Sequence, residues 1–246
     1  MTPDRPGFEA DWPATKGVRT WITVRSGGVS SPPYSSLNLA THVGDRPEDV
    51  AANRELLQQQ IKLPSAPVWL QQVHEKRVIE LPTTAPTPLA DGSWSNKKGV
   101  VCAVLSADCL PILLTNRSGT MVSALHAGWR GLAAGVIEQG VGCFTQPGDD
   151  LLAWLGPAIG QSSYEVGAEV REQFCRQAEE SEEMFLPSTE GRWLASMAGL
   201  ARQQLERLGV SSIHGGWRDT FADEEQFFSY RRDGETGRFA TLIWLE

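Results

Sequence analysis

The apolar stretch from Gly99 to Thr115 constrains the fold more than any other part of the chain. Its sequence, GVVCAVLSADCLPILLT, holds two apolar runs that are separated by Asp108 and, shortly after it, Pro111. β-branched residues favour strands, and a proline inside such a stretch breaks a helix. The stretch therefore predicts two buried strands that meet at a break near Asp108. These interruptions also make it too short for a membrane span.

Strands and helices are expected to be mixed along the rest of the chain. Strands are predicted at 18–25, 66–74, 76–81, 120–126, 151–159 and 238–246, and helices at 47–61, 129–144, 166–180 and 193–209. The segments 26–47 and 81–92 are predicted to be loops, the first of them long enough to be functional. Because strands and helices do not alternate strictly, an α+β fold is favoured over a doubly wound sheet, with one domain over residues 1–246.

Composition narrows the class of protein. Hydrophobic residues make up 41% and charged residues 21% of the chain, which is ordinary for a soluble globular protein. The net charge of −8 argues against a nucleic-acid binder but leaves room for a local basic pocket. With no export signal, no membrane span and no CxxC pair, we expect a cytoplasmic protein with reduced thiols. Three cysteines on apolar faces are expected to be structural: Cys102, Cys143 and Cys175.

Three residues of metal-ligating types lie at predicted strand ends. His74 and His126 each end an apolar run, and Cys109 lies at the strand break. Two imidazoles and a thiolate suit zinc and leave a position for water, whose pKa the metal lowers. Asp108 is then a candidate supporting group or general base. The alternative is that each of these residues is an ordinary member of the core.

The segment that follows His126 is a candidate anion site. Small residues, Ala127 and Gly128, let the backbone approach a ligand, and a helix is predicted to begin near Trp129 or Arg130. Arg130 offers a planar fork for phosphate or carboxylate, although a plain turn with a solvated arginine fits equally well. Trp129 offers a stacking surface beside His126.

Two further regions carry candidate binding residues. His42 lies on the long loop and is a candidate substrate contact, with a plain surface role as the alternative. The segment SYRRDGETGR holds three arginines around a turn, which either line an anionic pocket or form ion pairs. They are Arg231, Arg232 and Arg238, with Asp233 and Glu235 as the acidic partners.

The same residues also fit a cysteine hydrolase. In that case Cys109 is the nucleophile, a histidine is the base and Asp108 orients it. A bound metal would occupy the thiolate and count against this hypothesis. A copper oxidase is a third hypothesis, for which four histidines are few, because oxygen reduction needs several copper ions with imidazole ligands.

Several motifs, in their order along the chain, resemble the YfiH-like laccase-domain family. They are GGVSSPPYSSLNLATHVGD, NRELL, QQVH, ADG, ADCLPILL, HAGWRGLAAGV, LGPAIGQSSYEVGAEV and FFSYRRDGETGRFATLIWL. The pair of ADC and HAGWRG is specific, and the likeness runs from about Thr20 to the C-terminus. The chain is therefore identified as a member of this family.

The resemblance implies a fold, a metal site and an activity. It implies layered, mixed and antiparallel sheets with flanking helices, similar to the catalytic domain of cytotoxic necrotizing factor. It implies zinc, or alternatively copper, on His74, Cys109 and His126. It implies phosphorolysis of adenosine, inosine and methylthioadenosine, and deamination of adenosine, with a purine nucleoside and phosphate as the small-molecule partners.

One position departs from the family pattern. Many members carry Cys-Thr after the last glycine-rich turn, where this chain has Asp219 before Thr220. A role for that cysteine, as ligand or nucleophile, does not carry over to this chain.

Overall fold

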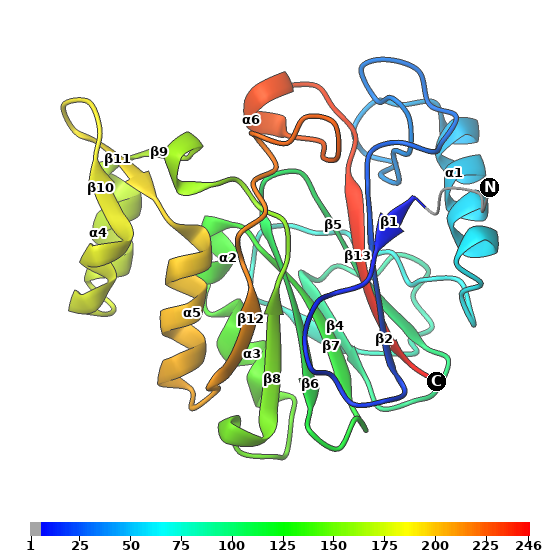
Figure 1. Cartoon of the computed structure of the whole chain (residues 1–246), viewed down its shortest axis with the longest axis horizontal. Helices are drawn as coiled ribbons and strands as arrows, with labels where there is room; N and C mark the ends of the chain where they lie inside the picture. Colours follow the sequence, from blue (N-terminus) through cyan, green and yellow to red (C-terminus); the bar gives the residue numbers. More distant parts are fainter. Residues whose placement is uncertain (1–5) are drawn as a thin grey trace.

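The structure, a computed structural model, describes residues 6–246 and is built around two β-sheets packed face to face (Figure 1). The larger sheet has six strands in the order β12–β8–β6–β7–β4–β3. They span Ser212–Gly215 (β12), Leu151–Leu155 (β8), Leu110–Asn116 (β6), Val122–Ala127 (β7), Gly92–Ser95 (β4) and Val78–Glu80 (β3). Its two edge pairs, β12–β8 and β3–β4, are parallel and the central pairs are antiparallel, so the sheet is mixed.

The smaller sheet has four antiparallel strands in the order β1–β2–β13–β5. They span Gly7–Phe8 (β1), Val18–Thr23 (β2), Phe239–Leu245 (β13) and Val101–Ser106 (β5). The predicted pair of strands in the Gly99–Thr115 stretch is confirmed, since β5 and β6 flank Asp108. These two strands belong to different sheets, so the turn between them crosses from one sheet to the other.

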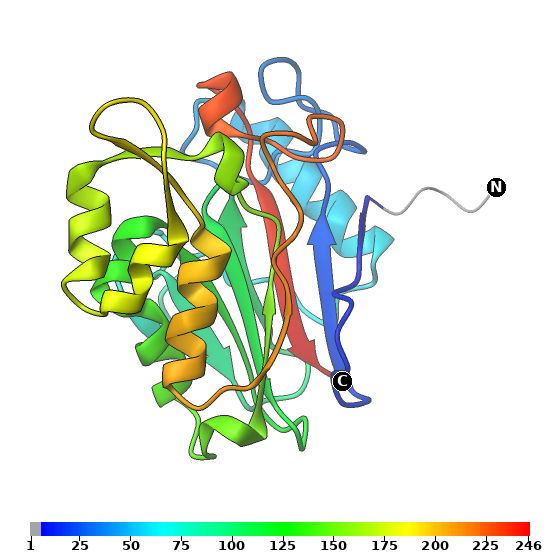
Figure 2. The same ribbon diagram turned by 60° about the vertical axis from the view of Figure 1, so that its left-hand side comes forward.

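Helices cover both outer faces of the sheet pair (Figure 2). The outer face of the six-stranded sheet packs against four helices, and the outer face of the four-stranded sheet packs against one. The four are Trp129–Ala134 (α2), Val136–Gly142 (α3), Ala168–Cys175 (α4) and Met197–Arg207 (α5), and the one is Pro47–Gln60 (α1). Three apolar clusters therefore separate four layers, which confirms the mixed α+β fold.

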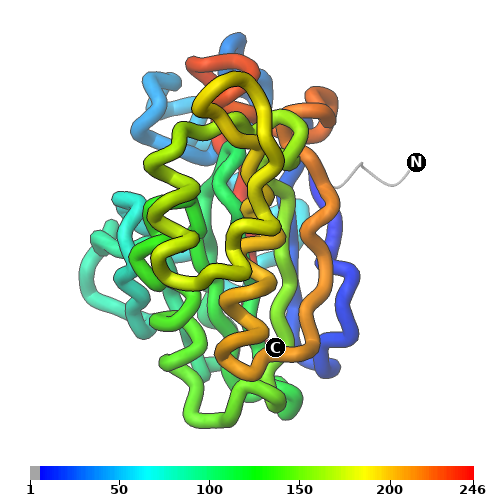
Figure 3. The backbone as a smooth tube through the Cα atoms, turned by 90° about the vertical axis from the view of Figure 1, so that its left-hand side faces the viewer, coloured from blue at the N-terminus to red at the C-terminus, as the bar shows by residue number. Residues whose placement is uncertain are grey.

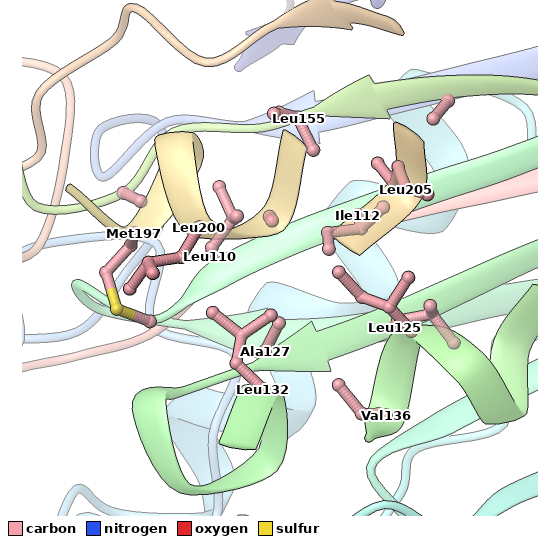
Figure 4. Packing of buried hydrophobic residues seen from close by; sticks show 14 of the residues in the cluster. Leu110, Ile112, Leu125, Ala127, Leu132, Val136, Leu155, Met197, Leu200 and Leu205 are labelled. Atoms are coloured by element: carbon pink, nitrogen blue, oxygen red, sulfur yellow. The ribbon is translucent and has the colours of Figure 1, made fainter. Parts of the chain in front are cut away.

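The largest apolar cluster holds the strands that end at the site. In Figure 4, Met197, Leu200 and Leu205 of α5 point toward the strands, where Leu110 and Ile112 lie next to them. Each fully buried leucine contributes about 1.5–3 kcal/mol relative to an exposed one. Buried side chains beside the strand ends fix the backbone there, which positions the polar residues that follow.

A small third sheet extends the helical layer. Its antiparallel strands are Phe185–Pro187 (β10), Arg192–Ala195 (β11) and Glu165–Gly167 (β9). Figure 3 shows this region in front of the strands when the molecule is seen from the helical side. A short helix, Tyr230–Asp233 (α6), lies at the end of the molecule where the loop between β2 and α1 also lies (Figure 1).

Four predicted elements were wrong in detail. The helix predicted at 166–180 is shorter, Ala168–Cys175, because the residues before it form β9. Residues 66–74 form isolated bridges instead of a strand, and the amide of Gln72 bonds the nitrogen and oxygen of Leu105, both at 2.8 Å. The predicted helix 129–144 is two helices, because Gly135 between them has φ +94°. The helix predicted from residue 193 begins at Met197, after the cap Ser196.

Candidate metal centre

Five strands bring their ends to one edge of the sheet pair. In the four-stranded sheet, Phe239 of β13 pairs with Ser106 of β5, and the end of β2 lies beside β13. In the six-stranded sheet, Leu110 of β6 pairs with Ala127 of β7. The turn from β5 to β6, the end of β7 and the start of β13 therefore meet, although they are far apart in the sequence.

At this edge the structure brings together the three predicted ligands, His74, Cys109 and His126. Their ligand atoms all lie within 4.8 Å of one another, and they form the one such cluster found among residues 6–246. The two imidazoles meet edge to face, with ring centroids 4.8 Å apart. His126 is buried, Cys109 is half-buried and His74 is exposed, so the centre opens to solvent on the His74 side.

Asp91, immediately before β4, organises this cluster. Its carboxylate accepts the backbone N–H groups of Val73, His74 and Glu75 at 2.8–3.1 Å. It also lies 2.8 Å from Nδ1 of His126, which directs the other ring nitrogen of His126 away from the carboxylate. One buried carboxylate therefore fixes both the segment that carries His74 and the ring of His126.

The charges of the cluster favour a thiolate. Burial raises the pKa of the Cys109 thiol, but His126 and hydrogen bonds from both histidines outweigh burial and lower it to about 6. Burial lowers the pKa of His126, yet the Cys109 thiolate and Asp91 raise it to about 9. Each group thus favours the charged form of the other, and the thiolate is the form of cysteine that binds a metal ion.

Local backbone geometry shows that the centre is a built site. His74 and Asp108 have φ of +63° and +86°, a region that costs a non-glycine residue about 1–3 kcal/mol and that clusters at functional sites. Gly128 lies against the ligands, because a Cβ there would be 3.0 Å from Sγ of Cys109 and 3.0 Å from Cδ2 of His74. The donor set, its spacing and this cradle fit a zinc-type ion.

Asp108 holds two other segments in place. Its carboxylate accepts the Thr220 hydroxyl at 2.7 Å and the backbone N–H of Arg231 at 2.7 Å. Its own backbone oxygen accepts the N–H of Ile159 at 3.0 Å. Asp108 thus ties α6 and the loop before it to the turn that carries Cys109, while Asp91 orients the histidine.

A cavity of about 400 Å³ opens onto the three ligands. Its volume falls within the range of small-molecule sites. Besides the ligands it is lined by His42, Gln72, Leu105, Ser106, Ala107, Tyr230 and Arg238. The predicted substrate contact His42 therefore lies beside the centre.

The other two predicted substrate contacts, Arg130 and Trp129, are not among the residues that line this cavity. Arg130 is exposed on α2 with its guanidinium 4.4 Å from the Trp129 ring centroid. Asp219, which precedes Thr220, accepts the N–H groups of Gly160 and Phe221 at 2.9 Å. This aspartate therefore has a local structural function in the loop that presents Thr220.

Sequence reasoning missed three residues of the site. Asp91 sits in the ADG motif, and its single acidic group between apolar segments was the available signal. Gln72 and Tyr230 gave no comparable signal, because their places in the cavity depend on how the segments pack.

With the fold and the site described, comparisons with known proteins define the class of protein. Residues 19–246 match the family described as multi-copper polyphenol oxidoreductase laccase. The chain belongs to this family.

Individual members of the family are similar to this chain over nearly its whole length. The chain is 52% identical over 236 residues to purine nucleoside phosphorylase YfiH of Escherichia coli, covering 95% of this chain and 96% of that protein. It is 50% identical over 237 residues to purine nucleoside phosphorylase PA4543 of Pseudomonas aeruginosa, covering 96% of this chain and 97% of that protein. Among solved structures, Neisseria meningitidis protein NMB0706 superposes with a TM-score of 0.93 at 46% identity, covering 98% and 99% of the two chains. YlmD from Geobacillus stearothermophilus gives 0.94 at 30% identity, covering 100% and 98%.

No helix in the described part of the chain is both long and apolar enough to cross a membrane. The four cysteines are all free, and Cys102 is fully buried, as expected for a structural residue.

Proposed function

We propose that the chain is a zinc-dependent purine nucleoside phosphorylase that acts on adenosine, inosine and methylthioadenosine. The observation that carries the proposal is the cluster of His74, Cys109 and His126 at the base of a cavity of nucleoside size. The name shared by relatives at about half identity over nearly the whole chain supplies the reaction.

In phosphorolysis an oxygen of the phosphate dianion forms a bond to C1′ of the ribose, and the bond from C1′ to N9 of the purine breaks. The electron pair of that bond stays on N9, and the phosphate proton ends on the purine. The products are ribose 1-phosphate and the free base, so no oxidant or reductant is needed. The demands on the protein are to hold phosphate near C1′ and to orient the nucleoside.

The residues of the centre divide these tasks. His74, Cys109 and His126 would hold the metal, with Asp91 positioning two of them through its four hydrogen bonds. A zinc ion held there supplies a Lewis acid and lowers the pKa of a bound water toward neutrality. Asp108, with both carboxylate oxygens engaged, keeps α6 against the cavity, and we assign it a positioning role in catalysis.

We further propose adenosine deamination at the same cavity. Water adds at C6 of the purine and ammonia leaves, so adenosine becomes inosine. This reaction requires no phosphate, and its signature is inosine formed from adenosine in a phosphate-free buffer.

A second candidate function follows from the alignment of Asp91, His126 and Cys109. The carboxylate orients the imidazole, and the imidazole favours the thiolate, which is the arrangement of a cysteine hydrolase. The acid in that arrangement is Asp91 instead of the predicted Asp108. Copper oxidation, by contrast, needs further copper ligands beyond the single three-residue cluster within residues 6–246.

The deciding experiment measures metal content and activity together. Zinc-loaded protein, adenosine and phosphate are expected to give adenine and ribose 1-phosphate, with activity lost on chelation and regained with zinc. Cys109→Ser is expected to lose both metal and activity, while the matched control Cys143→Ser, a half-buried thiol bonded to Gln139, keeps both. Metal-free protein with a rapidly alkylated Cys109 and no release of purine would contradict the phosphorylase and favour the hydrolase.

A further inference from the structure

Arg238, the residue before β13, has a guanidinium without an acidic partner. It donates from Nη1 to the backbone oxygens of Thr236 and Gly237 at 2.8 and 2.9 Å. No ion pair of Arg238 occurs within residues 6–246, although its sequence neighbour Glu235 is available. Glu235 instead accepts the hydroxyl of Tyr34. The remaining donors of Arg238 are therefore left for a ligand.

Of the three arginines of this segment only Arg232 forms an ion pair among the described residues, whereas the guanidinium of Arg238 lies 5.7 Å from the Tyr230 ring centroid. Arg232 pairs with Asp233 at 2.8 Å and also donates to three backbone oxygens, so its fork is fully used. Arg231 donates to the backbone oxygen of Glu165 and lies over Tyr164. Ion pairing, the commoner expectation for these arginines, is thus met by Arg232 but by neither Arg231 nor Arg238, and of these two only Arg238 lines the cavity at the metal centre.

The position of Arg238 places its free donors next to the metal centre. Arg238 lines the cavity that holds the three predicted ligands and also a second cavity of about 350 Å³ that opens beside it. His42 and Tyr230 line both cavities as well. A ligand that reaches the metal centre from the second cavity must pass these three side chains.

Two arginines near the cavity lack an acidic partner among the described residues, and the carboxylate that lines the second cavity, Glu235, accepts the Tyr34 hydroxyl. Arg54 of α1 donates its Nε and Nη2 to the backbone oxygen of Leu39 and stacks on Trp69, again without an acidic partner among the described residues. Burial, followed by the charges of Arg238 and Arg54, lowers the pKa of His42. The acidic groups nearest the centre, Asp91 and Asp108, are already engaged by hydrogen bonds.

We infer that Arg238, with His42 beside it, binds the inorganic phosphate that the reaction consumes, and that Arg130 does not. The inference rests on the proposed phosphorolysis for its biological meaning. Its chemistry is that of a guanidinium fork, which binds a phosphate dianion through parallel charge-assisted hydrogen bonds. Phosphate held there faces the same cavity as the metal centre, as attack on a bound nucleoside requires.

The test uses zinc-loaded full-length protein and two independent measurements. The first is the dissociation constant of inorganic phosphate without nucleoside, and the second is the phosphate KM with saturating inosine. Arg238→Ala is expected to raise both by about 10- to 100-fold with an unchanged inosine KM, and Arg238→Lys by less. The matched control Arg176→Ala removes an exposed arginine from the C-cap of α4 and is expected to change neither.

The outcomes separate this inference from the proposed function. Wild-type protein that binds phosphate through Arg238 but releases no purine contradicts the phosphorylase and leaves the phosphate site standing. Active protein in which Arg238→Ala keeps the wild-type phosphate constants, or in which Arg130→Ala alone raises them, overturns the site. Adenosine 5′-monophosphate is a further probe. If Arg238→Ala loses binding of this nucleotide but keeps wild-type binding of inorganic phosphate, the proposed site for inorganic phosphate is also overturned.

Discussion

Replacement of Asp91 by asparagine tests the central support of the site. The carboxylate is fully buried and faces four donors, three backbone N–H groups and Nδ1 of His126. An asparagine has the same shape but one oxygen, so its amide nitrogen faces two of these donors whichever way it turns. Two charge-assisted hydrogen bonds of about 1.5–3 kcal/mol each are lost, and we expect Asp91→Asn to lower the free energy of unfolding by about 3–5 kcal/mol.

The same substitution is expected to weaken zinc binding by about 10- to 100-fold, because His126 loses the group that orients its ring. Urea unfolding of metal-free protein and zinc competition with a chelator measure the two effects separately. Asp149→Asn, on an exposed turn, is the control for the loss of one charge. Unfolding and zinc affinity both within experimental error of wild type would refute the role that we assign to Asp91.

The pH dependence of stability gives the sign of the Asp91 contribution. Burial raises the pKa of this carboxyl, but the hydrogen bonds from His126 and the backbone outweigh burial and lower it. A carboxyl whose pKa is lower in the folded state stabilises the fold above its unfolded pKa, about 4, and that stabilisation is lost on acidification. As the pH falls from about 5 to about 3, the free energy of unfolding of Asp91→Asn is therefore expected to decrease less than that of the wild type.

Three further predictions concern the metal ligands. Alanine at His74, Cys109 or His126 should abolish zinc binding with the circular dichroism spectrum unchanged, and full zinc occupancy in any of them would show that the ligand is misassigned. Zinc affinity should rise about tenfold per pH unit from about pH 6 to 9, because the metal displaces the proton of His126. It should rise more steeply with pH below pH 6, where Cys109 is also protonated. A zinc affinity that does not change with pH would contradict this prediction. Gly128→Ala should weaken zinc binding by about 5- to 100-fold, because its Cβ would crowd Cys109 and His74, whereas Gly142→Ala, with open space around it, should not; equal affinities would mean that the ligands yield easily.

The sequence determined the elements whose signal is local. Two apolar runs around Asp108 predicted β5 and β6, and the proline at residue 47 with acidic neighbours predicted the start of α1. Each of these signals depends on residues within one or two turns or strand lengths. The three candidate ligands were also chosen from sequence, because polar ligand types stand out at the ends of apolar runs.

Some errors arose because hydrophobic periodicity does not register a change of backbone direction. Leu132 and Val136 both face the core across the break at Gly135, so the apolar pattern continues although the helix does not. The segment before His74 has the alternation of a strand, but a side-chain amide takes the place of the backbone pairing. Neither feature changes the one-dimensional pattern that predicts an element.

Only the tertiary structure decided which polar groups act together. The sequence indicated Asp108 as the acid that supports the histidine, yet the fold gives the histidine to Asp91 and the loop residue Thr220 to Asp108. It likewise leaves Arg130 on Trp129 and turns Arg238 toward the cavity. Hydrogen bonds and ion pairs act over a few ångströms, so their partners are fixed by the packing of distant segments, which a local pattern of residues does not encode.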